Sequence, residues 1–232
     1  MKSNKDLAVI SAVLKENLEL SGSPVAMKIV TSPEQIPSGI PEIEETIRHC
    51  CMISLARKGK IFYATDAKHQ CNGGAWALGL RAKGDTLRTG EFYYKLGKYE
   101  SLSSSRRTME SVPNLPQETY ATLYAPLEKA EFAPGVVMIF AKPKAMLKLA
   151  QTILYRLGGR IYPQFSGIQS VCSDATAQVL LSGKPNFSLG CDGSRKFSGI
   201  ADEEMVVGFP VEMIAEIAEH LATVVNAVGS KK

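Results

Sequence analysis

Two segments of this chain follow the same order of residues and expected elements. The first segment runs from Cys51 to Cys71, and the second runs from Cys172 to Cys191. In both, a helical pattern, a Gly-Lys pair and a short strand pattern separate the two cysteines, and a glycine-rich turn follows the second cysteine. Such internal similarity indicates either duplication of one α/β unit or chance similarity between two α/β units.

The other patterns also alternate between helix and strand. Helices are expected at 4–20, 43–57, 143–157, 171–181 and 211–228, and strands at 25–30, 61–65, 119–127, 135–141, 186–189 and 204–209. The longest irregular stretch, 97–117, is expected to be a surface loop or lid. We therefore expect an α/β fold, with α+β as the alternative, in which two related halves with mixed sheets pack as one compact unit. The first half is 1–117, with Cys51 and Cys71, and the second is 118–232, with Cys172 and Cys191.

Composition narrows the class of protein. Of the 232 residues, 45% are hydrophobic and 22% are charged, which is ordinary for a globular protein. No apolar run reaches the roughly 18–20 residues that a membrane span needs. The N-terminal segment is an amphipathic helix rather than a signal peptide, so we expect a cytoplasmic protein with no membrane partner. The net charge is +4, but the basic residues are not concentrated in a stripe, which argues against a nucleic-acid partner. The small positive surplus is compatible with a small anionic ligand.

In the cytoplasm, cysteines are thiols or ligands more often than disulfides. If the two segments pack around a pseudo-twofold axis, their four cysteines meet near that axis. Four thiolates are the ligand set of a [4Fe-4S] cluster or of a tetrahedral zinc ion. The sequence therefore predicts an iron–sulfur or metal-binding protein with the ligands Cys51, Cys71, Cys172 and Cys191. The alternative is that these cysteines are small buried core residues.

Cys50 competes with Cys51 for this role. Adjacent helical residues point about 100° apart, so only one of the two can face the site, and the duplication favours Cys51. His49 and His69 lie beside Cys50 and Cys71. Each histidine could complete a mixed site or act as an acid or base, or it could be a solvated residue at a helix end.

The turns that follow two of the cysteines suit ligand binding. Glycines allow a backbone to approach a bulky group, and free N–H groups there bind sulfides or anions. We expect this role for Gly73, Gly74 and Gly193, and we expect Asp192, Arg195 and Lys196 to complete an anion-binding loop. An ordinary β-turn at Asp192-Gly193 is the alternative.

Two other functions remain open. One is a metal-free enzyme or ligand-binding protein in which Cys191 is a reactive thiol beside the anion-binding loop. The other is an interaction protein that uses 97–117 as its contact surface. A redox partner and a homo-oligomer are compatible with the leading prediction, and the sequence does not decide whether the protein is an enzyme.

Several of these stretches resemble a known family. They are Cys51 with Ala56-Arg57-Lys58-Gly59, Cys71-Asn-Gly-Gly with Leu78-Gly79, Ser170-Val-Cys-Ser-Asp-Ala, Gly183-Lys-Pro-Asn-Phe-Ser-Leu-Gly-Cys-Asp-Gly-Ser-Arg-Lys-Phe and Ala201-Asp-Glu-Glu-Met-Val-Val-Gly-Phe-Pro. Together they resemble domain of unknown function 169, which is common in archaea and anaerobic bacteria. The resemblance implies no particular activity, and the anaerobic setting that it implies is compatible with an oxygen-sensitive cluster.

Overall fold

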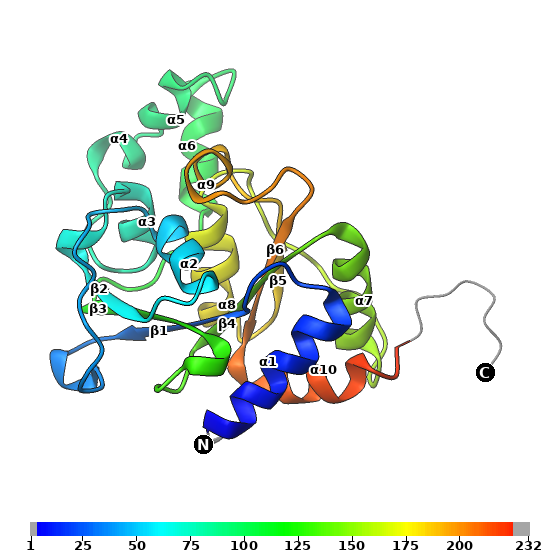
Figure 1. Ribbon diagram of the computed structural model, residues 1–232. Helices are drawn as coiled ribbons and strands as arrows, with labels where there is room; N and C mark the ends of the chain where they lie inside the picture. Colours follow the sequence, from blue (N-terminus) through cyan, green and yellow to red (C-terminus); the bar gives the residue numbers. More distant parts are fainter. Residues whose placement is uncertain (1–3, 225–232) are drawn as a thin grey trace.

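The computed structural model describes residues 4–224, which form helices around one six-stranded sheet (Figure 1). The strands are β1 (Val25–Val30), β2 (Phe62–Thr65), β3 (Ala121–Pro126), β4 (Val136–Ala141), β5 (Asn186–Ser188) and β6 (Met205–Pro210). Their order in the sheet is β2-β3-β1-β4-β6-β5. The expected α/β class is confirmed. The sheet differs from the expected mixed sheets, because each pairing between these strands is antiparallel.

The strand order is symmetric about its centre. The central strands β1 and β4 pair with each other, β1 is followed outward by β3 and β2, and β4 is followed outward by β6 and β5. Both sets also follow the same order along the chain: central strand, edge strand, then the strand between them. This topology supports an internal duplication. It groups β3 with the first set, so the two sets divide between η3 (Leu127–Lys129) and β4 rather than at residue 117.

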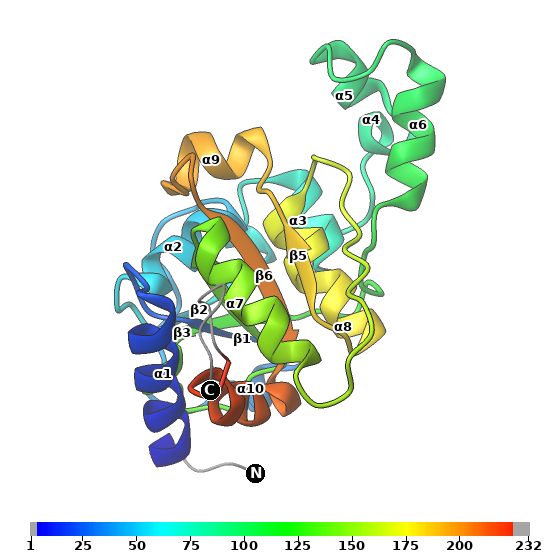
Figure 2. The same cartoon turned by 90° about the vertical axis from the view of Figure 1, so that its right-hand side faces the viewer.

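Three helices cover one face of the sheet: α1 (Asn4–Leu18), α7 (Pro143–Leu154) and α10 (Ile214–Leu221) (Figures 1 and 2). Their buried residues pack with alternate residues of the strands, such as Val137 and Ile139 of β4. A three-residue turn of 3₁₀ type, η5 (Val211–Met213), leads from β6 into α10 within the helix expected over 211–228. Residues 225–228 lie outside the described part of the chain.

The opposite face carries α2 (His49–Arg57), α3 (Asn72–Ala77) and a π-helix, η4 (Ser170–Ala177), which continues into α8 (Gln178–Ser182). Here the other set of alternate strand residues is buried, including Val136 and Met138 of β4 and Tyr124 of β3. In the π-helix the Thr176 hydroxyl donates a hydrogen bond to the Val171 carbonyl oxygen, 2.7 Å away. Single π-helical turns within helices occur frequently at functional sites.

The segment between α3 and β3 projects from the sheet (Figure 2). It contains α4 (Asp85–Arg88), α5 (Glu91–Lys95) and α6 (Leu102–Ser111). The stretch 97–117, expected to be a loop, therefore contains a ten-residue helix. The Ser101 hydroxyl caps α6 by accepting a hydrogen bond from the Ser104 N–H, 3.1 Å away. The remaining elements are α9 (Asp192–Ser198) and the short turns η1 (Pro33–Gln35) and η2 (Asp66–Lys68). No helix in residues 4–224 is both long and apolar enough to cross a membrane.

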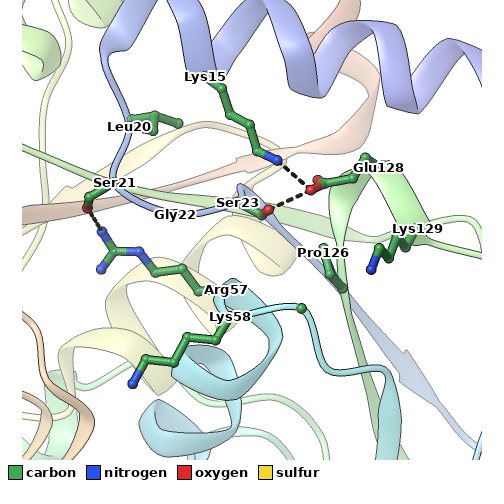
Figure 3. Close-up of a pocket in the computed structure, with 11 residues that line it drawn as sticks. Lys15, Leu20, Ser21, Gly22, Ser23, Arg57, Lys58, Pro126, Glu128 and Lys129 are labelled. Carbon is green, nitrogen blue, oxygen red and sulfur yellow. Dashed lines mark hydrogen bonds and ion pairs between the residues drawn. The ribbon is translucent and has the colours of Figure 1, made fainter.

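Glu128 ties α1 and the start of β1 to the turn after β3. Its carboxylate accepts hydrogen bonds from Ser11 at 2.8 Å and Ser23 at 2.6 Å and forms an ion pair with Lys15. Figure 3 shows Lys15 and Ser23 pointing at this carboxylate from one side of a shallow hollow of about 360 Å³. Partial burial raises the pKa of Glu128, but the hydrogen bonds from Lys15, Ser23 and Ser11 outweigh it and lower the pKa to about 2.

We expect Glu128→Gln to remove an acid-sensitive contribution to stability. The folded-state pKa is below its ordinary value of 4.5, so the stabilisation is present above about pH 4.5 and is lost as the pH falls towards 2. After allowance for solvent screening, we expect the substitution to lower the free energy of unfolding by about 2 kcal/mol at pH 7 and by much less near pH 2. Urea unfolding at both pH values measures this difference. Glu131→Gln, at an exposed carboxylate, is the control, and an equal loss at both pH values would contradict the prediction.

Candidate functional site

A cavity of about 680 Å³ lies where α2, α3, η4, α9 and the projecting segment meet. Its wall contains sulfur, amide, cationic and aromatic groups. The lining residues include Arg48, Cys50, Cys71, Gln169, Cys172, Cys191, Lys196 and Phe197. Sulfurs from four separate segments of the chain therefore line one space.

Cys71 and Cys191 occupy equivalent positions in the two sets of elements. Each is the residue before a short helix that follows an edge strand, α3 after β2 and α9 after β5. The Cys71 Sγ accepts a hydrogen bond from the Gly74 N–H, and the Cys191 Sγ accepts one from the Ser194 N–H, both at 3.4 Å. The Ser194 hydroxyl accepts a hydrogen bond from the Cys191 N–H in return, at 2.9 Å. The second glycine-rich turn thus begins a helix with a capping box rather than forming an isolated β-turn.

Cys172 lies close to Cys71, with Gly74 between them. A β-carbon placed on Gly74 would be 3.6 Å from the Cys71 Cβ and 3.8 Å from the Cys172 Sγ. Burial, together with the nearby sulfurs of Cys71 and Cys191, raises the pKa of Cys172 well above its ordinary value. These sulfurs are therefore near enough to influence one another's charge.

The structure places Cys50, not Cys51, at the cavity. Cys50 lines it, whereas Cys51 does not, and the Cys51 thiol donates a hydrogen bond to the Phe197 carbonyl oxygen at 3.3 Å. The hydrogen bond with Cys51, burial, and the neighbouring Cys172 and Cys191 raise the pKa of Cys50. The alignment of Cys51 with Cys172 predicted that Cys51 faces the site, and this prediction is wrong. Cys51 is on an α-helix and Cys172 is on a π-helix, so equivalent positions along the chain do not point their side chains in equivalent directions.

Gly73 makes room for Gln169, a cavity residue that no sequence pattern predicted. A β-carbon at Gly73 would lie 2.7 Å from the Gln169 Nε2, so any larger residue would displace this amide. Gln169 precedes η4, has a left-handed φ of 51° and is 4% exposed. Its Oε1 is buried without a hydrogen-bond partner in the described residues. No sequence motif marks Gln169, because its contact with Gly73 joins distant segments.

Of the residues expected to form an anion-binding loop, Asp192, Gly193 and Lys196 line the cavity and Arg195 does not. Lys196 and Gly193 line the cavity, and a β-carbon on Gly193 would be 3.9 Å from the Cys191 Sγ. Asp192 also lines it and forms an ion pair with Lys98 of the projecting segment. Arg195 does not line the cavity. Its guanidinium donates hydrogen bonds to the carbonyl oxygens of Ala201, Leu189 and Glu204, so it is engaged by the backbone on both sides of α9.

Both histidines are buried rather than solvated. In His49, Nδ1 is 2.8 Å from the Tyr124 hydroxyl and Nε2 is 3.3 Å from the Thr176 hydroxyl. The His69 Nε2 is 3.0 Å from the Thr122 hydroxyl. Burial is the main cause that lowers the pKa of each histidine to about 3, so both rings are neutral at pH 7. His49 lines the cavity and His69 does not.

Two comparisons with known proteins cover most of the chain. The model of the family DUF169, described as "Uncharacterised ArCR", matches residues 13–220. The chain belongs to the DUF169 family. The uncharacterized protein MJ0308 of Methanocaldococcus jannaschii is 44% identical over 210 residues, which is 90% of each chain. No solved structure matches this DUF169 protein.

Two further properties of the DUF169 cavity bear on what it could bind. The first is that two cationic side chains line the cavity close to the Phe197 ring. The Arg48 guanidinium lies 3.8 Å from the centre of this ring, and the Lys196 ammonium lies 5.4 Å from it. Within residues 4–224, no three His, Cys, Asp or Glu side chains are grouped closely enough to hold a single metal ion. The cysteines therefore surround a space instead of meeting at a point.

Proposed function

We propose that this protein binds a [4Fe-4S] cluster through Cys50, Cys71, Cys172 and Cys191 and uses it in electron transfer. The observation that carries the proposal is that sulfurs from four separate segments line one cavity. Four cysteine thiolates are the usual ligands of such a cluster. The ligand set differs from the one expected from the sequence only in the exchange of Cys51 for Cys50.

The electrostatics of the cavity support a bound cationic centre. Burial raises the pKa of Cys172, and the Cys50 pKa is raised as well, so four thiolates without a metal would repel one another in a poorly solvated space. Iron ions would offset this repulsion. The Cys71 and Cys191 sulfurs already accept hydrogen bonds from backbone N–H groups. Hydrogen bonds of this kind to ligand sulfurs influence the reduction potential of a cluster.

The spacing of the sulfurs favours a cluster over one zinc ion. Zinc holds each thiolate at about 2.3 Å from a common centre, which requires the four sulfurs to converge tightly. The cysteines of the described chain have no such grouping. A multi-iron cluster spreads its ligands over a wider space, and the cavity of about 680 Å³ leaves room for it.

The test is iron and sulfide analysis of anaerobically purified protein. We expect a brown protein that absorbs near 400 nm and contains about four irons per chain. We expect Cys50→Ala and Cys172→Ala each to lose most of the iron, because each removes one ligand. Cys51→Ala is a matched control: it changes the adjacent residue of the same helix and is expected to keep the wild-type iron content.

Three results would contradict the proposal. Metal-free wild-type protein would exclude the cluster, and colourless protein with one zinc per chain would replace it with a zinc site. Iron loss in Cys51→Ala but not in Cys50→Ala would show that the ligand assignment is wrong.

A second candidate is thiol chemistry at Cys191 without metal. It is favoured by the position of the Cys191 sulfur, which is partly exposed, accepts an N–H at the start of α9 and shares the cavity wall with Lys196. In metal-free protein, this candidate predicts that iodoacetamide alkylates Cys191 faster than the other cysteines. Slow alkylation at Cys191 would exclude it.

A further inference from the structure

The cavity has the properties of a small-molecule site as well as those of a cluster site. Its volume of about 680 Å³ lies within the range of about 300–1,000 Å³ that is usual for ligand pockets. The projecting segment contributes an apolar wall of Leu87, Phe92, Tyr93 and Leu96, and Ile168 extends it. Such pockets combine an apolar wall with a few polar groups that orient the ligand.

Gln169 has one buried polar atom without a partner, its Oε1, although its side chain also forms a hydrogen bond with Tyr93. Its side chain is buried against Gly73, its Nε2 lies 4.0 Å from the Met109 sulfur, and its Oε1 accepts no hydrogen bond from the described residues. A buried acceptor without a donor is unfavourable. The left-handed backbone of Gln169 adds strain, which proteins retain most often at functional sites. A bound molecule that donates an O–H or N–H would satisfy this oxygen.

The charged groups of the wall favour an anion. Its cations are Arg48, Lys98 and Lys196, and among the described lining residues Asp192 is the one acid. Asp192 is paired with Lys98, which leaves the cations of Arg48 and Lys196, both close to the Phe197 ring. Cations at the rim of a pocket attract anionic ligands and hold their charged group near solvent.

We propose that the cavity binds a small organic anion that has an aromatic or similarly apolar body and a hydrogen-bond donor. The donor bonds to the Gln169 Oε1, the body lies against Tyr93 and Phe197, and the carboxylate or phosphate lies near Lys196 and Arg48. The inference rests on the proposed function only in placing this ligand beside a cluster. The residues that recognise the ligand are not the residues that would hold iron.

Three matched probes test the recognition by isothermal titration calorimetry with the full chain. 4-Hydroxyphenylacetate has the donor, the ring and the charge; phenylacetate lacks the donor; 2-(4-hydroxyphenyl)ethanol lacks the charge. We expect 4-hydroxyphenylacetate to bind about tenfold more tightly than either of the other two, which is the affinity equivalent of one hydrogen bond or one exposed charge contact.

Two substitutions assign the contacts. Gln169→Met should weaken binding of 4-hydroxyphenylacetate about tenfold without changing that of phenylacetate, because only the donor contact is lost. The same variant should have an unchanged or higher melting temperature without ligand, since an unpaired buried oxygen is removed. Gln169→Asn, which tolerates a left-handed backbone but is shorter, replaces it if Gln169→Met does not fold. Lys196→Met should weaken both anions and leave the neutral probe unchanged, and Lys58→Met, which does not line the cavity, should change none.

Iron content measured on the same preparations separates this inference from the cluster. Cluster-loaded protein that binds none of the probes would overturn the inference and leave the cluster intact. Iron-free protein that still binds 4-hydroxyphenylacetate through Gln169 would support the inference and overturn the cluster. Binding that neither Gln169→Met nor Lys196→Met changes would also overturn the inference.

Discussion

Gly208→Ala is expected to lower the free energy of unfolding by about 3 kcal/mol. Gly208 is in β6, where it pairs with Met138 on one side and with Asn186 on the other. A β-carbon at this position would lie 2.0 Å from the Ala175 carbonyl oxygen and 2.9 Å from its carbon. These atoms belong to the backbone of η4, so the clash cannot be relieved by a change of side-chain rotamer. Either η4 must move away from the sheet or β6 must bend.

Urea unfolding measures this loss, and Gly84→Ala is the matched control. A β-carbon on Gly84 would meet no atom within 4 Å, and Gly84 has a φ of −62°, which alanine adopts easily. We expect Gly84→Ala to change stability by less than about 1 kcal/mol. If the protein holds the proposed cluster, Gly208→Ala should also reduce iron retention, because η4 carries Cys172. A Gly208→Ala protein as stable as Gly84→Ala would contradict the close packing of η4 on β6.

Arg57→Met is expected to destabilise the protein by about 3–5 kcal/mol, because it leaves Glu204 as a buried charge without its partner. Arg57 ends α2, and Glu204 directly precedes β6. Their side chains are 14% and 9% exposed; one guanidinium nitrogen is 3.0 Å from the carboxylate, and a second also contacts it. The second nitrogen also donates to the Ser21 hydroxyl, as Figure 3 shows. The contact thus joins α2 of the first set of elements to β6 of the second.

The pH dependence of this effect has a definite sign. Burial raises the pKa of Glu204, but the Arg57 contacts outweigh it, so the pKa is lowered from its ordinary value of 4.5. The contribution of Glu204 is therefore present above about pH 4.5 and is lost as the solution becomes more acidic. Without Arg57, burial favours the neutral acid, and protonation removes the unpaired charge. The difference between the wild type and Arg57→Met should therefore be largest at pH 7 and should shrink as the pH falls towards and below 4.5.

Urea unfolding at pH 7 and pH 4 measures this change. The double variant Arg57→Met/Glu204→Met is the control, because replacement of both charges by apolar groups should recover most of the stability at pH 7. A loss that is the same at both pH values, or a double variant no more stable than Arg57→Met, would contradict the role assigned to the buried charge.

Local patterns in the sequence determined the elements and part of the site. The spacing of apolar residues depends on the helical and strand periods, so it predicted the α/β class and the positions of the six strands. Repetition of the same pattern predicted equivalent positions for Cys71 and Cys191, which the two helix N-termini confirm. The same repetition predicted that Cys172 lies near them, and Cys172 lines the same cavity. These features follow from contacts between near neighbours in the chain or from similarity between two segments.

Only the tertiary structure decided which side chains face the cavity. Cys50 rather than Cys51 lines it because the Cys51 thiol bonds to Phe197, which is far away in the sequence. Arg195 is occupied by carbonyl oxygens, and Gln169 enters the cavity because Gly73 leaves it room. The direction of a side chain and the availability of its polar atoms depend on contacts between distant segments. Periodicity along one segment carries no information about these contacts, and so it could not predict them.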